Sequence, residues 1–234
     1  MLIIGASGDI GIAIAEQLAK EGYQLILHYH SNQKGIETIR ENVSTESILD
    51  VLQADLSNEN EIRMFLTQLV FPVDMIVFVS GKAYFGLLQD TPEDVMDEML
   101  TLHVKAPWMI TKYLLPHMVQ SQFGKIIFIT SIWGDVGASN EVIYSSVKGA
   151  QNSFVKALAK EVAPSGISVN AISPGYVDTK MNSHLNEEEK NAILSEIPVS
   201  RAAKPTDVAN TVSFLLDERS NYIQGEVIHL TGGW

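Results

Sequence analysis

Tyr144 and Lys148 carry the two side chains of this sequence that are best placed for proton transfer. They stand four positions apart in "YSSVKGA", so a helix would put both on one face. A tyrosine with a pKa of about 10 exchanges protons poorly at neutral pH, and a neighbouring ammonium stabilises its phenolate and lowers that pKa. The pair is therefore a candidate for general acid–base catalysis. Ser131 ends the apolar run "KIIFITS" thirteen residues earlier and could add a hydroxyl.

The same spacing also fits an ordinary helix face, on which Tyr144 packs and Lys148 points to water. The pattern Tyr-x-x-x-Lys is common, and by itself it is structural more often than catalytic. The elements that position the pair must therefore decide between the two interpretations.

Apolar runs that predict strands alternate with stretches of helical period along the whole chain. Several of these runs are apolar on both faces, which is typical of strands in a parallel sheet with helices on each side. The sequence therefore predicts an α/β fold: a doubly wound, Rossmann-type parallel sheet with helices on both faces, in a single domain spanning residues 1–234. The predicted strands lie in "MLIIGAS", "YQLILHYH", "SILDVLQADL", "VDMIVFVSG", "GKIIFITS", "ISVNAISPG" and "GEVIHLTGG", and the predicted helices cover 10–21, 35–42, 60–69, about 92–121 and about 142–162.

A polar stretch at about 176–200, with "NEEEK" inside it, follows a predicted strand. Ligands in such sheets bind beyond the carboxyl ends of the strands, so this stretch is predicted to be a small helical substrate lid. Its outer face reads as a solvated charged helix in either case.

Composition and charge narrow the function classes. The formal net charge of −12 disfavours binding to nucleic acid or to an anionic membrane surface. The absence of cysteine excludes disulfides, thiolate metal sites and cysteine nucleophiles. No run approaches the roughly 18 to 20 apolar residues that span a bilayer, and no basic leader is present, so a cytoplasmic location is expected. His28 and His30 alternate on a predicted strand but lack a third ligand, so no metal site is expected.

The stretch "IIGASGDIGIAIAEQLAKEG" reads as a strand, a glycine-rich turn and an amphipathic helix. Gly5, Gly8 and Gly11 would let the backbone turn tightly and approach a pyrophosphate, while free N–H groups at the helix start supply donors. At the first strand-to-helix junction, this turn favours dinucleotide binding over a purely structural role.

Taken together, the glycine turn, Ser131, Tyr144 and Lys148 resemble the short-chain dehydrogenase/reductase family, whose fingerprints are T-G-x-x-x-G-x-G and Y-x-x-x-K. Ile4 stands at the family's threonine and Asp9 at its middle glycine. Asp9 is expected to point away from the pyrophosphate and cap the helix. The segments "NAISPGYVDT" and "QGEVIHLTGGW" also resemble the family, so the likeness covers essentially the whole chain.

The resemblance implies a reductase site. Tyr144 would protonate a carbonyl oxygen as hydride reaches its carbon, Ser131 would hydrogen-bond the same oxygen, and Lys148 would also hold the nicotinamide ribose. His103, in "TLHVKAPWM", occupies the place of the family's catalytic asparagine and could keep a proton relay with altered pH dependence, or be a structural helix residue. The implied cofactor-binding residues are Gly5, Ser7, Gly8, Ile10, Gly11, His30, Ser31, Asn32, Asp55, Leu56, Gly81, Tyr144, Lys148, Pro174, Gly175, Val177 and Thr179.

The end of the second predicted strand bears on the choice of cofactor. In such folds an acidic residue there binds the ribose 2′-hydroxyl and would repel a 2′-phosphate, and the family's spacing puts that position at Tyr29. Because no acid stands there and His30, Ser31 and Asn32 could donate hydrogen bonds, NADP(H) is favoured over NAD(H).

Two substrates are suggested by resemblance. The chain is broadly similar to 3-oxoacyl-[acyl-carrier-protein] reductases, but where those enzymes carry basic docking residues it keeps Lys125 and has Gln122 and Ser165. The segment "SIWGDVGASNEVIYSSVKGAQNSFVKALAKEVAPSGI" resembles elongation factor P 5-aminopentanone reductases, which reduce a ketone on a modified lysine. There Trp133 would form a pocket wall and stack on an ammonium, or simply pack.

The expected activity is therefore NADPH-dependent reduction of a ketone carried on elongation factor P or on acyl carrier protein. A sensor that binds NADP without catalysis is the alternative from another class. The family also implies a homodimer or homotetramer, formed by the helices at about 92–121 and 142–162.

Overall fold

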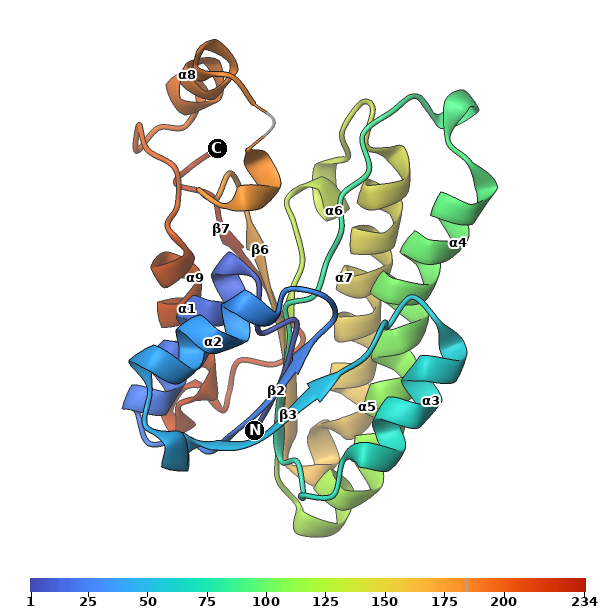
Figure 1. Cartoon of the computed structure of the whole chain (residues 1–234), viewed down its shortest axis with the longest axis vertical. Coiled ribbons are helices and arrows are strands. Elements are labelled where there is room, and N and C mark those ends of the chain that lie inside the picture. Colours follow the sequence, from blue (N-terminus) through green and yellow to red (C-terminus); the bar gives the residue numbers. More distant parts are fainter. Residues whose placement is uncertain (184) are drawn as a thin grey trace.

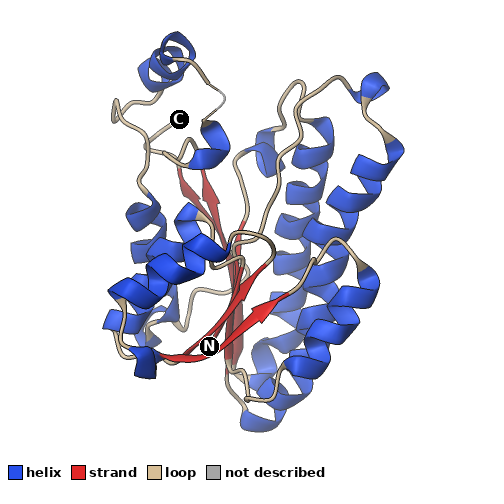
Figure 2. Ribbon diagram, in the orientation of Figure 1, coloured by secondary structure: helices blue, strands red, loops and turns tan. Residues whose placement is uncertain are grey.

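A single sheet of seven parallel strands forms the centre of the molecule (Figures 1 and 2). The computed structural model describes residues 1–183 and 185–234. The strand order is β3-β2-β1-β4-β5-β6-β7, so the direction of winding reverses between β1 and β4, which is where doubly wound sheets open a ligand crevice. The strands are β1 (Leu2–Ile4), β2 (Leu25–Tyr29), β3 (Ile48–Gln53), β4 (Met75–Phe78), β5 (Gly124–Ile129), β6 (Ile167–Pro174) and β7 (Val227–Leu230).

Helices cover both faces of this sheet. Figure 1 shows α1, α2 and α9 on one face and α3, α4, α5 and α7 on the other, while α6 and α8 lie near the carboxyl ends of the strands. The helices are α1 (Asp9–Lys20), α2 (Gln33–Asn42), α3 (Glu59–Gln68), α4 (Glu93–Leu100), α5 (Ala106–Ser121), α6 (Trp133–Val136), α7 (Val142–Val162), α8 (Glu187–Glu196) and α9 (Pro205–Leu216).

The core lies in two layers, one on each side of the sheet. Leu2 and Ile4 of β1 belong to the layer that contains Phe128, whereas Ile3 between them belongs to the layer that contains Leu27. All five side chains are fully or almost fully buried. Successive side chains of a strand point to opposite faces, so a strand buried on both faces is apolar at most of its positions. The predicted α/β fold with a doubly wound parallel sheet is confirmed.

Most predicted elements lie close to their observed bounds, and α7 matches its predicted range of 142–162. The single helix predicted at about 92–121 is interrupted: α4 and α5 are joined by a π-helical turn, Thr101–Lys105. Helix α9 was not predicted, although its apolar residues pack against α1. None of the helices in residues 1–183 and 185–234 is both long and apolar enough to cross a lipid bilayer.

Candidate active site

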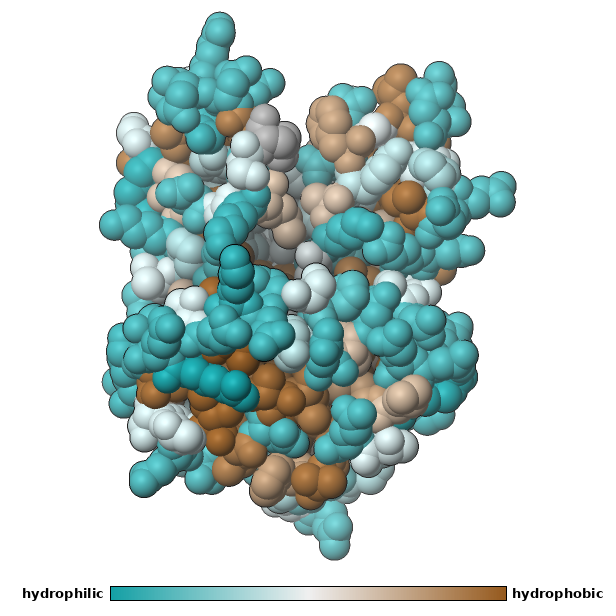
Figure 3. Space-filling view, in the orientation of Figure 1, coloured by the Kyte–Doolittle hydropathy of each residue, from teal (hydrophilic) through white to brown (hydrophobic). Residues whose placement is uncertain are grey.

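Two adjoining cavities open at the carboxyl ends of the strands. The larger, of about 580 Å³, runs from the start of α1 past the ends of β2 and β3, and the smaller, of about 280 Å³, lies between α7 and the segment after β6. In the space-filling view the molecule is hollowed on this side, and hydrophilic residues cover much of the surrounding surface (Figure 3). The two cavities share the lining residues Ile10, Val79, Gly81, Ala83, Thr179 and Met181, so a ligand can extend from one into the other.

The turn between β1 and α1 needs glycine at two positions. Gly5 has φ +87°, and a Cβ there would lie 2.5 Å from the backbone nitrogen of Ser80. A Cβ at Gly11 would lie 2.3 Å from the carbonyl oxygen of Gly5. Any side chain at either position would push β1, α1 and the end of β4 apart. The glycine spacing seen in the sequence thus reflects close backbone packing beneath the larger cavity.

His28 of β2 supports this turn from below. Its Nδ1 accepts a hydrogen bond from the backbone N–H of Gly5 at 3.2 Å, and its Nε2 lies 3.0 Å from the carbonyl oxygen of Ala54. Burial lowers the pKa of His28 to about 4, so the ring is neutral, with its proton on Nε2 donated to Ala54. His28 is a structural residue. In residues 1–183 and 185–234, no group of three or more His, Cys, Asp or Glu side chains is arranged to hold a metal.

The larger cavity has the features that a dinucleotide requires. Gly8 is the N-cap of α1 and no side chain caps the helix, so its first N–H groups are not occupied by a capping side chain, and Gly8, Ile10 and Gly11 line this cavity. The residues therefore fit a pyrophosphate at the helix start. The predicted cofactor residues that line this cavity are Gly5, Ser7, Gly8, Ile10, Gly11, His30, Ser31, Asn32, Asp55, Leu56, Gly81 and Thr179, and those that line the smaller cavity are Ile10, Gly81, Tyr144, Lys148, Pro174, Gly175, Val177 and Thr179.

The side chain of Asn32 already forms hydrogen bonds within the fold, which changes its expected role as a donor to the cofactor. Its side-chain amide donates to the carbonyl oxygen of Ser7 at 2.6 Å, and its Oδ1 accepts from the N–H of Gly35 at the start of α2. The imidazole of His30 lies 3.9 Å from a carboxylate oxygen of Asp55 and is largely exposed. Of the residues after β2, His30 and Ser31 therefore retain side chains available to a 2′-phosphate, and Asn32 shapes the loop instead.

Asp9 lines the larger cavity and does not cap α1. Its Oδ2 accepts a hydrogen bond from the backbone N–H of Lys180 at 2.6 Å, and the ammonium of Lys180 lies 4.0 Å from Oδ1. Asp9 thus connects the glycine turn to the segment after β6. The capping expectation failed because this contact joins residues 171 positions apart, which no local pattern reveals.

Residues from the predicted lid, 176–200, form one side of the smaller cavity. Tyr176, Asn182 and Ile193 are among its lining residues, and α8 begins with a capping box in which Asn186 and Glu189 bond each other's backbone N–H groups. His184 lies outside the described residues. Motion of this segment stays a prediction.

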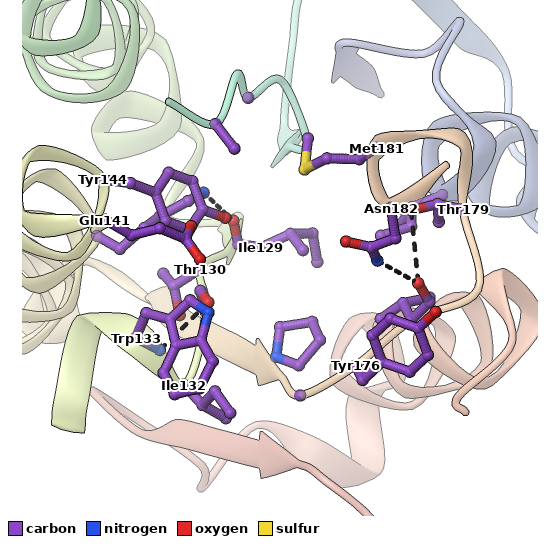
Figure 4. Close-up of a pocket in the computed structure, with 18 of the residues that line it drawn as sticks. Ile129, Thr130, Ile132, Trp133, Glu141, Tyr144, Tyr176, Thr179, Met181 and Asn182 are labelled. Atoms are coloured by element: carbon purple, nitrogen blue, oxygen red, sulfur yellow. Dashed lines mark hydrogen bonds between the residues drawn. The ribbon is translucent and has the colours of Figure 1, made fainter. Parts of the chain in front are cut away.

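The three predicted catalytic side chains line the smaller cavity together. Ser131 follows β5, while Tyr144 and Lys148 share one face of α7. Figure 4 shows Tyr144 on the wall of this cavity. The Lys148 ammonium lies 5.7 Å from the centre of the Tyr144 ring and donates to the carbonyl oxygen of Ile129 at 2.9 Å. Lys148 is 3% exposed, so the lysine does not point to water. The alternative of a solvated lysine on an ordinary helix face is therefore wrong.

The expected acidification of the tyrosine is not found. Burial raises the pKa of Tyr144 to about 12, although its hydrogen bond with Ser131 opposes that rise, and the charge of Glu141 adds to it. Burial also lowers the pKa of Lys148 to about 7, so the lysine holds only part of its charge at neutral pH. The sequence argument counted the attraction of an ammonium for a phenolate and left out the cost of burying both groups.

His103 lies behind the cavity and is not part of its described lining. The π-helical turn holds it fully buried, with Nε2 3.0 Å from the carbonyl oxygen of Lys82 and its own carbonyl oxygen accepting from Gln151 at 2.7 Å. Burial and the nearby Lys148 lower the pKa of His103 to about 3, so the ring stays neutral near pH 7. The expectation that its own titration would alter the pH dependence is therefore not supported. Its Nδ1 is buried and has no hydrogen-bond partner among the described residues.

Several residues of the smaller cavity were not recognised from the sequence. Glu141 and the C-terminal Trp234 line it beside Trp133, and the rings of Trp133 and Trp234 meet edge to face with centroids 5.4 Å apart. Glu141 stands three residues before Tyr144, so its position in the sequence could have indicated that it lies near the site. No pattern could have brought Trp234 to the site, because a distant contact between its indole N–H and Glu196 places it there.

Comparisons with known proteins agree with this geometry. The model of the family described as "Enoyl-(Acyl carrier protein) reductase" matches residues 5–234. The chain is 47% identical over 235 residues to the uncharacterised oxidoreductase YmfI of Bacillus subtilis, covering 100% of this chain and 97% of that protein. It is 31% identical over 236 residues to the 3-oxoacyl-[acyl-carrier-protein] reductase FabG of Staphylococcus aureus, covering 99% of this chain and 96% of that protein.

Two solved structures share the whole fold. One, from Beutenbergia cavernae, is provisionally named an NAD(P)-dependent gluconate 5-dehydrogenase and has NADP bound at low occupancy; its TM-score is 0.93 at 28% identity, covering 100% of this chain and 95% of that one. The other is a short-chain dehydrogenase/reductase from Serratia marcescens, with a TM-score of 0.90 at 26% identity, covering 99% of this chain and 96% of that one. This chain belongs to the short-chain dehydrogenase/reductase family and is an NAD(P)-dependent oxidoreductase.

Proposed function

We propose that the protein reduces a ketone to a secondary alcohol, with NADPH as the reductant. The observation that carries this proposal is the meeting of Ser131, Tyr144 and Lys148 on the wall of a cavity that opens into a dinucleotide-sized one. NADPH, when bound, supplies the hydride. A non-catalytic sensor has no need for this buried arrangement of a phenol and an ammonium, so the sensor alternative is disfavoured.

In this proposal Tyr144 is the proton donor. A raised pKa of about 12 keeps the phenol protonated at neutral pH, which suits an acid that gives its proton to an oxygen gaining negative charge. Ser131 hydrogen-bonds the same oxygen, and its hydroxyl is itself held by the backbone N–H of Trp133 at 3.2 Å. Lys148 lies close enough to stabilise the phenolate that remains after proton transfer.

NADPH is proposed over NADH for two reasons. No acidic residue ends β2, where an acid would repel a 2′-phosphate, and His30 and Ser31 are there to contact one. The solved relative from Beutenbergia cavernae has NADP bound.

His103 is proposed to belong to the proton route between Lys148 and solvent. A Cβ at Gly81 would lie 3.2 Å from Cε1 of His103 and 3.9 Å from the ammonium of Lys148, so both side chains border one small space. A water bound at Nδ1 of His103 there would connect them.

Replacing His103 with leucine is expected to lower kcat by about tenfold or more while leaving the KM for NADPH little changed, because a proton route is lost and the dinucleotide cavity is not altered. His103→Asn should recover most of the loss, since an amide can also hold a water. Steady-state kinetics measure both. His117→Leu, in the exposed pair of His117 with Asp74, is the control and should behave as wild type. Equal kcat in His103→Leu and wild type would contradict the relay.

For the substrate, we propose a ketone carried on a protein, most like the aminopentanone on elongation factor P. The alternative, a 3-oxoacyl group on acyl carrier protein, is supported by the 31% identity to FabG. Lys125, the basic residue kept from that family's docking positions, opposes the alternative. It is 3% exposed, and its ammonium donates to Asn221 at 2.6 Å and to the carbonyl oxygens of Leu215 and Asp217 at the end of α9. A lysine bound in this way cannot attract an acidic partner.

The test is a direct comparison of the two carried ketones. Purified protein with NADPH should reduce aminopentanone-modified elongation factor P much faster than acetoacetyl carrier protein, measured by NADPH oxidation and by the mass of the product. Reduction of the carrier-bound ketone at the rate of a dedicated FabG would support the alternative instead.

We also propose a homodimer or homotetramer built on α4, α5 and α7. Leu100, Trp108 and Tyr113 expose 54%, 48% and 49% of their surface on α4 and α5, so these helices offer apolar side chains for contact with a second chain. Light scattering should report an assembly of two or four chains.

A further inference from the structure

Asp9 joins two elements that are far apart in the sequence but line the same cavity. It stands at the start of α1, and its Oδ2 accepts the 2.6 Å hydrogen bond from the backbone N–H of Lys180. Lys180 is the first residue of a short 3-10 helix, Lys180–Asn182, in the segment that follows β6. Both Asp9 and Lys180 line the larger cavity. Asp9 is therefore a residue of one cavity wall that is bonded to the backbone of another.

This hydrogen bond caps the 3-10 helix from outside. Thr179 is the N-cap residue of that helix, and its side chain makes no cap hydrogen bond. The first N–H groups of a helix have no partner within the helix, so an acceptor from elsewhere can satisfy one of them. A carboxylate is a strong acceptor, because its charge strengthens the bond. Asp9 thus does for the 3-10 helix what was expected of it at α1.

The contact lies where the two cavities meet. Ile10, the neighbour of Asp9, lines both cavities. So do Thr179 and Met181, which stand on either side of Lys180. A dinucleotide that extends from the larger cavity into the smaller one must therefore pass this contact.

The segment after β6 also has attachments that do not involve Asp9. The backbone N–H of Asp178 donates to the carbonyl oxygen of Ala203 at 2.9 Å, and the side-chain amide of Asn182 donates to the carbonyl oxygen of Val177 at 2.7 Å. Removing the carboxylate of Asp9 leaves these bonds in place. The segment should then stay folded while its connection to the glycine turn is lost.

The ion pair of Asp9 with Lys180 adds little to this connection. The ammonium of Lys180 lies 4.0 Å from Oδ1 of Asp9, and the lysine side chain is 87% exposed. Ion pairs exposed to this extent contribute little to stability. The bond to the backbone N–H is therefore the important one, and it does not require a lysine at position 180.

We propose that Asp9 is a positioning residue, which holds the segment after β6 across the passage between the two cavities and thereby slows release of the bound dinucleotide. This inference rests on the proposed binding of NADPH, but it does not depend on which ketone is reduced.

The rate of NADPH dissociation tests the proposal directly. It is measured by stopped-flow fluorescence, with excess NADP⁺ displacing the bound NADPH. In Asp9→Ala the rate should rise about tenfold or more, since a hydrogen bond to a charged acceptor is lost. Asp9→Asn keeps an oxygen that can accept from the same N–H and should recover most of the slow release. Lys180→Met keeps the backbone N–H and should release NADPH as wild type does.

The wall of the substrate cavity should respond as well. Met181 and Asn182 line the smaller cavity, and Figure 4 shows both across it from Tyr144. Asp9→Ala should therefore raise the KM for the ketone several-fold. Its kcat at saturation should stay within a few-fold of wild type, because Ser131, Tyr144 and Lys148 are not altered.

Hydrogen exchange of the protein without cofactor gives a readout that needs neither NADPH nor a ketone. The backbone amide at position 180 should be protected in wild type and in Lys180→Met, and should exchange about tenfold faster or more in Asp9→Ala. An unchanged melting temperature would show that each variant is folded.

Glu93→Ala is the matched control. Glu93 is exposed and is the first residue of α4, as Asp9 is the first residue of α1, so the variant removes the same charge from the start of a helix. It should release NADPH at the rate of wild type. Equal dissociation rates in Asp9→Ala and wild type would overturn the proposal, and so would an effect of Lys180→Met as large as that of Asp9→Ala. If wild type does not bind NADPH, the proposed cofactor is wrong, and hydrogen exchange together with displacement of NADH still decides the role of Asp9.

Discussion

Replacing Tyr144 with phenylalanine is expected to lower kcat for ketone reduction by about a hundredfold to ten-thousandfold, the usual contribution of a positioned acid. The phenol is the acidic group that the structure brings to the cavity wall with Ser131, and phenylalanine keeps its ring while removing the proton. The KM for NADPH should change little. Stopped-flow or steady-state oxidation of NADPH with a saturating ketone measures the loss.

Tyr176→Phe is the matched control for this variant. Tyr176 also lines the smaller cavity but belongs to the segment after β6 and lies across the cavity from Tyr144 in Figure 4, so losing its hydroxyl should leave kcat within a few-fold of wild type. A fluorescence titration should show equal NADPH affinity in both variants. Wild-type turnover by Tyr144→Phe would remove the tyrosine from the mechanism and would favour the non-catalytic sensor.

The arrangement of the fold could be predicted because its signals are local. The strands of a sheet covered on both faces are mostly apolar, and all residues of β1 and β4 are. The periodicity of α7 gave its bounds, and these fix the shared face of Tyr144 and Lys148. Since parallel strands end at one edge, Ser131 after β5 had to lie near that helix.

Features that depend on distant contacts could not be predicted. Lys125 lies at the start of the predicted strand "GKIIFITS", and nothing in the sequence shows that its ammonium binds the end of α9, about 90 residues later in the chain. Asp9 bonds Lys180, and Trp234 reaches the cavity through Glu196. The pKa of Tyr144 was misjudged for a related reason: the burial that raises it is produced by the whole fold.

Replacing Lys148 with methionine is expected to lower kcat by about a hundredfold or more and, at the same time, to stabilise the fold. The lowered pKa of Lys148, from 10.5 to about 7, corresponds to a burial cost of roughly 5 kcal/mol for the charged form. Losing its hydrogen bond leaves the carbonyl oxygen of Ile129 without that donor, which costs about 1–3 kcal/mol. The first effect is the larger, so the melting temperature of Lys148→Met should rise at neutral pH as activity disappears.

The pH dependence of stability and of kcat/KM distinguishes this account from simple damage to the site. The unfolded chain binds the Lys148 proton more tightly than the folded chain does, so the destabilisation is complete below about pH 7 and fades as the pH rises towards 10.5. The stability gap between Lys148→Met and wild type should narrow over that window. Wild-type kcat/KM should fall as the pH rises through about 7, because the ammonium that stabilises the Tyr144 phenolate is lost. If the difference in stability between Lys148→Met and wild type stays constant with pH, burial of the Lys148 charge has no cost. The placement of Lys148 beside Tyr144 would then need another explanation.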